Sequence, residues 1–112
     1  MMIEITVIDY LSETLSVHVS IEKPKGEKEY VLIDRTGGSE KNKIKSATLA
    51  IQSYSETLHA AMLLNERVKA AMEKMVSLDD ISKVELNTDY NFTDPETKEY
   101  RYQAIYDLVY ME

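Results

Sequence analysis

Two runs of alternating apolar and polar residues in the last third of the chain constrain the fold more than any other feature. One side of the first run consists of Val84, Leu86, Thr88, Tyr90 and Phe92. One side of the second run consists of Tyr100, Tyr102, Ala104, Tyr106, Leu108 and Tyr110. A two-residue period is typical of strands that bury one face, and Pro95 between the runs cannot donate a backbone hydrogen bond. The sequence therefore predicts an antiparallel hairpin with a tyrosine-rich face.

Length and composition predict one soluble domain. The chain has 112 residues, enough for one core but not for two, so we expect a single domain over residues 1–112. It contains no cysteine, which excludes disulfides and thiolate metal sites. It has no apolar run of the roughly 20 residues that a membrane helix needs, and its start is acidic where a signal peptide is basic. The net charge of -7 opposes binding to nucleic-acid phosphates. We expect neither a membrane nor a specific nucleic acid as partner.

The first half of the chain predicts one short helix and three strands. Apolar residues at helical intervals predict an amphipathic helix over residues 5–15. The apolar stripe of this helix consists of Ile5, Ile8, Leu11 and Leu15. Alternating or continuous apolar residues predict strands over residues 17–21, 30–34 and 44–53. Residues 35–43 are polar and contain paired glycines, which predicts a loop. This loop leads into a strand, unlike a phosphate-binding P-loop, which leads into a helix.

A long amphipathic helix precedes the tyrosine-rich hairpin. Ser53 and Glu56 have the spacing of a capping box, which predicts the start of the helix. Its apolar stripe is Leu58, Met62, Asn65, Val68, Met72 and Met75, and the pattern ends at residues 78–80. The complete order is α-β-β-β-α-β-β. We therefore predict an α+β fold, a mainly antiparallel sheet with the long helix and the short N-terminal helix packed on one face.

The titratable residues form no recognisable catalytic or metal-binding motif. His18 and His59 are the only histidines, and neither has a second strong ligand at zinc-like spacing. Asp89, Asp94 and Glu96 lack the regular spacing and the glycine of a calcium loop. We expect no catalytic residue, no metal and no cofactor. The excess of tyrosine instead favours a protein-binding surface, because tyrosine suits interfaces that are partly wet.

Three sequence blocks resemble a known family. They are residues 31–38 (VLIDRTGG), residues 50–57 (AIQSYSET), and residues 90–94 (YNFTD) together with residues 100–108 (YRYQAIYDL). In this order they resemble the tail-terminator proteins of long-tailed bacteriophages and of prophages in Gram-positive bacteria. These proteins are also called tail-completion or minor tail proteins.

The resemblance implies a structural protein of the virion tail, assembled in the cytoplasm of the bacterial host. Such a subunit forms a ring, typically a hexamer, on the last ring of the tail tube. The ring stops tube polymerisation and offers a head-tail joining surface. The partners implied are further copies of the chain, the tail tube protein and a head-side connector protein. No enzymatic activity is implied.

We assign the interface with neighbours or partners to two surfaces, because strand edges and a glycine-rich loop can be completed by a neighbouring chain. The loop contributes Arg35, Thr36, Gly37, Gly38, Lys41 and Lys43, and the hairpin contributes Tyr90, Phe92, Tyr100 and Arg101. In a closed ring, one patch of each subunit contacts the other, different patch of the next subunit.

Two other functions remain open from the sequence. The first is a head-completion or stopper protein of the phage neck, which also forms a ring but usually has a different fold. The second is a small ligand-binding or enzyme domain that uses carboxylates such as Asp89 and Asp94. A deep apolar pocket around a buried carboxylate would favour this second function, and a flat open surface would disfavour it.

Overall fold

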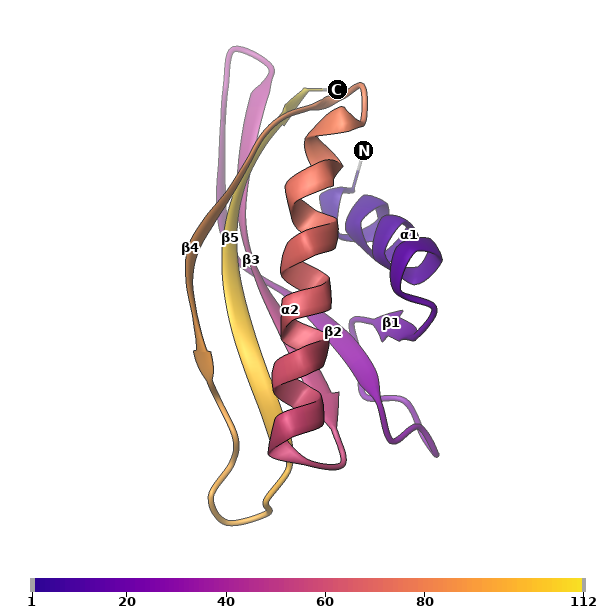
Figure 1. Ribbon diagram of the computed structural model, residues 1–112. Coiled ribbons are helices and arrows are strands. Elements are labelled where there is room, and N and C mark those ends of the chain that lie inside the picture. Colours follow the sequence, from indigo (N-terminus) through magenta and orange to yellow (C-terminus); the bar gives the residue numbers. More distant parts are fainter. Residues whose placement is uncertain (1, 112) are drawn as a thin grey trace.

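The computed structural model describes residues 2–111, which form an α+β domain with its helices on one face of a five-stranded sheet (Figure 1). The elements in chain order are α1 (Ile3–Leu15), β1 (His18–Ser20), β2 (Tyr30–Lys41), β3 (Ile44–Ser55), α2 (Leu58–Lys74), the short 3-10 helix η1 (Met75–Ser77), β4 (Ile81–Asn91) and β5 (Tyr100–Met111). The strands lie side by side in the order β1-β2-β3-β5-β4. β1 runs parallel to β2, and the other neighbours are antiparallel. The predicted fold class and element order are confirmed.

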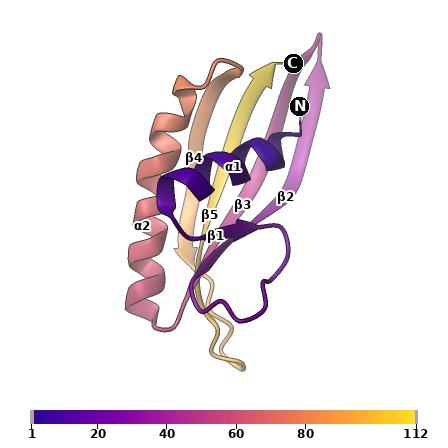
Figure 2. The ribbon, with the colours of Figure 1, turned by 90° about the vertical axis from the view of Figure 1, so that its right-hand side faces the viewer.

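The core lies between the helices and one face of the sheet. α2 runs along β3 and β5, and α1 crosses beside β1 and β2 (Figures 1 and 2). Leu49 and Leu108 from the sheet and Val68 from α2 are completely buried in this layer. The described part of the chain places no helix on the other face of the sheet, which we call the open face (Figure 1).

Both helices bury a stripe that differs in part from the predicted one. The buried residues of α1 are Ile3, Val7, Leu11 and Leu15, whereas Ile5 is 48% exposed. α1 therefore begins two residues before the predicted start. Every fourth residue of the helix, counted from Ile3, is buried in the core. The buried residues of α2 are Ala61, Leu64, Asn65, Val68, Ala71 and Met72. Leu58 and Met62, placed on the core side by the sequence pattern, are exposed, and Ala61 and Leu64 face the core at this end of α2 instead.

The predicted loop over residues 35–43 is wrong, because β2 continues to Lys41 and pairs with β3 along a two-stranded hairpin. Only Asn42 and Lys43 form the turn, and both have positive φ, at 54° and 67°. Two central residues with positive φ define the turn that matches the twist of a tight hairpin. The outer half of β2 is exposed on both faces, so no apolar alternation marks it as a strand.

The N-cap of α2 is Thr57 rather than the predicted Ser53. The Thr57 hydroxyl accepts a hydrogen bond from the backbone N–H of Ala60 at 3.0 Å, which satisfies a free donor of the first turn. Ser53 lies inside β3 and is completely buried. The capping-box spacing was therefore coincidental, because β3 extends to Ser55 and α2 begins only after it.

A β-bulge in β4 divides the face that the sequence predicts as continuous. Leu86 lies opposite Tyr106 on the helix-covered face, but the register shifts between Leu86 and Thr88. Beyond the shift, Asp89 lies on the helix-covered face and Tyr90 on the open face, as their pairing with Ala104 and Gln103 shows. The alternation predicted for β5 is confirmed, since every second residue from Ala104 to Tyr110 is buried.

Candidate interaction surfaces

Both edges of the sheet leave backbone groups available to another strand. β1 pairs with β2 only along Tyr30–Leu32, so the stretch from Ile33 to Lys41 has no neighbour on that side in residues 2–111. β4 forms the opposite edge along Ile81–Asn91. Exposed edges of this length are templates for pairing with another chain. The two edges run antiparallel to one another within the subunit, because β2, β3, β5 and β4 alternate in direction.

The two predicted interface surfaces lie in different parts of the sheet. Ile44 pairs with Met111 and Ser55 pairs with Tyr100, so the turn of the β2–β3 hairpin and the β4–β5 connection are separated by the full length of β3 (Figure 1). The longest dimension of the domain is 44 Å. Lys41 and Lys43 lie at the hairpin end, whereas Arg35 pairs with Leu49 near the middle of β3, and Thr36, Gly37 and Gly38 follow it along β2. At the other end lie Tyr90, Phe92, Tyr100 and Arg101. The first predicted group is thus spread along the outer half of β2 and its turn, and the two groups are not brought together.

Arg35 is held against the hairpin and α1. Its Nε donates a hydrogen bond to the Gly37 carbonyl at 3.3 Å, and its Nη1 lies 3.9 Å from Glu4 Oε1. Gly38 lies under the guanidinium group: a Cβ added there would lie 2.2 Å from Arg35 Nη2 and 2.9 Å from the Ser46 carbonyl oxygen. Gly38 is therefore required by close packing, whereas Gly37 has open space around its Cα.

Gly38→Ala should lower the free energy of unfolding by about 1 to 2 kcal/mol, because the new methyl group must displace both a side chain and a strand carbonyl. Gly37→Ala is the matched control, since its methyl group meets nothing within 4 Å. Urea denaturation of both variants measures the difference. Equal stabilities would show that the Arg35 side chain does not occupy this position in solution.

Arg101 organises an aromatic cluster at the other end of the sheet. Its guanidinium carbon lies 4.6 Å from the centre of the Phe92 ring and 5.5 Å from that of Tyr54. Its Nε donates to the Phe92 carbonyl at 2.7 Å, and its Nη1 donates to the Tyr54 hydroxyl at 2.9 Å. Tyr54 also stacks on Tyr30 with ring centroids 4.6 Å apart. Arg101 is therefore engaged within the subunit, which makes it a structural residue as well as a candidate contact. Tyr30 and Tyr54 were not among the predicted interface residues, although both lie on the open face of paired strands.

On the open face of the sheet, polar side chains of neighbouring strands form hydrogen bonds with one another. Gln52 Nε2 donates to Gln103 Oε1 at 2.7 Å, and Thr48 donates to Asp107 at 2.7 Å. Gln103 Nε2 donates to the Tyr90 hydroxyl at 2.5 Å. These bonds connect β3, β5 and β4 across this face.

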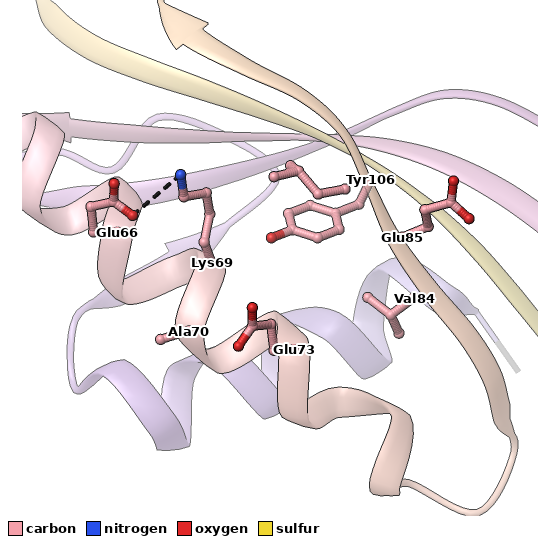
Figure 3. Close-up of a pocket in the computed structure, with 8 residues that line it drawn as sticks. Glu66, Lys69, Ala70, Glu73, Val84, Glu85 and Tyr106 are labelled. Carbon is pink, nitrogen blue, oxygen red and sulfur yellow. Dashed lines mark ion pairs between the residues drawn. The ribbon is translucent and has the colours of Figure 1, made fainter.

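A groove of about 620 Å³ separates α2 from β4 (Figure 3). It is lined by Glu66, Lys69, Ala70 and Glu73 of α2, Val84, Glu85 and Leu86 of β4, and Tyr106 of β5. Lys69 Nζ lies 3.0 Å from Asp89 Oδ2 and 3.2 Å from Glu66 Oε2. The hydrogen bond to Asp89 is the main reason that the pKa of Lys69 is raised. The groove thus contains one cation, which two carboxylates already neutralise.

Burial, together with the negative charges of Asp89, Glu73 and Glu66, raises the pKa of Tyr106 to about 12. The ordinary value is 10.0, so the folded protein holds the phenol proton more tightly than the unfolded chain does. The resulting stabilisation is fully present below the unfolded pKa and is lost as the pH rises through the folded pKa.

Between pH 10 and 12, the wild-type protein should therefore lose about 2 kcal/mol more stability than the Tyr106→Phe variant, which has no phenol to ionise. Denaturant titrations at several pH values measure this difference. Tyr100→Phe, at the half-exposed start of β5, is the control and should follow the wild type. Parallel pH profiles of the wild type and Tyr106→Phe would contradict the assignment.

Among residues 2–111, no three His, Asp or Glu side chains are placed to hold a metal ion. No helix in that same part of the chain is long and apolar enough to cross a membrane. The sequence matches no protein-family model, and no curated protein is significantly similar to it.

Proposed function

We propose that this protein is a tail-terminator subunit of a long-tailed phage or prophage. Several copies form a ring, in the family typically a hexamer, that caps the tail tube, stops its polymerisation and provides the surface for joining the head. The protein has a structural role in the virion and no catalytic one. The proposal starts from the resemblance carried by the sequence blocks 31–38, 50–57 and 90–108.

The observation that carries the proposal is the complementarity of the two free sheet edges. In a ring, the contact is heterologous, so the β4 edge of one subunit faces the β2 edge of the next. Rotation about an axis close to the strand direction preserves the direction of each strand. Because β2 and β4 run antiparallel within a subunit, their pairing between subunits is also antiparallel and continues the sheet.

The two ends of the sheet supply the contacts along the axis of such a ring. The hairpin turn at Asn42 and Lys43 projects at one end, and the β4–β5 connection projects at the other (Figures 1 and 2). One end then meets the tube and the other meets the head-side connector. The net charge of -7 per subunit favours passage of DNA without adhesion to its phosphates.

Locating the protein in virions tests this proposal. Immunogold labelling of an epitope-tagged copy should mark the head-proximal end of the tail in purified particles. Labelling along the whole tube or at the distal tip would contradict the proposal. Labelling of tail-less heads would indicate the neck stopper instead.

A further inference from the structure

The groove between α2 and β4 contains two polar groups that lack partners. Tyr106 is only 3% exposed, and its hydroxyl makes no hydrogen bond to any residue from 2 to 111. Figure 3 shows this hydroxyl directed toward the Lys69 and Glu73 side chains. The Glu73 carboxylate likewise has no ion pair or hydrogen bond in the described residues. The Tyr106 hydroxyl oxygen is accessible at the groove and the Glu73 carboxylate is exposed, so both are available to a group that enters it.

The lining of the groove matches a lysine side chain. Val84, Leu86 and Ala70 provide apolar contacts for a methylene stem. The Glu73 carboxylate and the Tyr106 hydroxyl can both accept hydrogen bonds from an ammonium group at the end of that stem. The phenol remains protonated at neutral pH because burial raises its pKa to about 12, so it presents a neutral oxygen.

The same chain carries exposed lysines at the turn of the β2–β3 hairpin. Lys41 and Lys43 flank Asn42, and neither has an ion-pair partner within residues 2–111. The turn extends beyond the ends of β4 and β5 in both views (Figures 1 and 2). A projecting basic turn is thus complementary in charge to the groove.

We propose that a hairpin lysine of one copy, Lys41 or Lys43, occupies the α2/β4 groove of the neighbouring copy between Glu73 and Tyr106. Within one subunit β5 separates the β2–β3 hairpin from β4, which lines the groove, so the contact joins two copies. The two surfaces are different, so the contact is heterologous, as a ring requires. This inference rests on the proposed ring and specifies one of its contacts.

Cross-linking between introduced cysteines tests the contact, because the natural chain contains none. Asn42→Cys places a thiol at the turn and leaves both lysines intact. Ala70→Cys places a thiol at the groove, on the exposed side of α2, and leaves Glu73 and Tyr106 intact. With a short bismaleimide, the double variant should give a ladder of cross-linked oligomers, both as the concentrated purified protein and in assembled tails. The control pairs Asn42→Cys with Glu13→Cys, an exposed position on α1.

A charge exchange supplies the second arm of the test. Adding Glu73→Lys to the cross-linking variant should lower the yield at least tenfold, because the groove then repels the turn. Further addition of Lys41→Glu and Lys43→Glu should restore it. Circular dichroism of each variant checks that the fold persists, which is expected because all three positions are exposed.

The outcomes separate this inference from the proposed function. A ladder that responds to the charge exchange supports both. Dimers that carry two cross-links would support the contact but contradict a head-to-tail ring. The absence of cross-linking above the Glu13 control, in solution and in tails, would overturn the contact. The proposed terminator ring would then still be tested separately, by the length of tails assembled with the gene disrupted.

Discussion

Leu108→Asp should leave the chain unfolded under native conditions, whereas Ile105→Asp, on the same strand, should fold with a loss of about 1 kcal/mol. Leu108 is completely buried between the sheet and α2, and an unpaired carboxylate there costs several kcal/mol in addition to the lost apolar contacts. Small domains have a total stability of about 5 to 15 kcal/mol. Ile105 is half-buried on the open face, where a new carboxylate remains in contact with water and loses mainly strand propensity.

Circular dichroism and thermal denaturation of the two variants measure the contrast. Leu108→Ala is the size control and should remain folded with a loss of about 3 kcal/mol, since it creates a cavity without burying a charge. If Ile105→Asp unfolded the protein as completely as Leu108→Asp, the second face of the sheet would not be open in the monomer. The one-sided architecture on which the proposed assembly depends would then be wrong.

Arg101→Ala should lower the free energy of unfolding by about 3 kcal/mol, an unusually large effect for a residue on the uncovered face. The substitution removes two charge-assisted hydrogen bonds, to the Phe92 carbonyl and the Tyr54 hydroxyl. It also removes the contacts of the guanidinium group with the Phe92 and Tyr54 rings. Urea denaturation monitored by tyrosine fluorescence measures the loss.

Arg101→Lys distinguishes this account from a simple effect of charge. A lysine keeps the positive charge but cannot make the planar fork that reaches two acceptors while lying against two rings, so it should recover less than half of the lost stability. Full recovery would show that charge alone matters at this position. Because the loss affects the monomer, an assembly defect of Arg101→Ala would not by itself identify an interface.

The fold was predictable where one face of an element is buried and the other is not. β5 alternates from Ala104 to Tyr110 because Ala104, Leu108 and Tyr110 face the helices, whereas Ile105, Asp107 and Val109 between them are only half-buried. The outer half of β2 was mistaken for a loop for the same reason, since both of its faces are exposed and its paired glycines resemble a turn. Its strand character comes from pairing with β3, a long-range contact that no local pattern records.

Sequence patterns pointed to segments of the chain that could form interfaces. They could not show which side chains of other strands those segments contact. Each predicted surface consists of residues close in sequence, yet the contacts of Arg101 depend on Tyr54, which lies on another strand. The contact of Asp89 with Asn65 and Lys69 was not predicted, because the bulge at residues 86–88 turns Asp89 toward α2. A bulge of one residue has no signature in an alternating sequence, so the face of every residue beyond it is misassigned.

Electron microscopy of phage tails assembled with this gene disrupted tests the central claim most directly. The account predicts tubes that exceed the normal length and fail to join heads, because polymerisation lacks its terminator. Restoring the gene should restore tails of uniform length joined to heads. Tails of normal length on DNA-filled heads would contradict the account, and tails of normal length beside unsealed heads would assign the protein to the neck as a stopper.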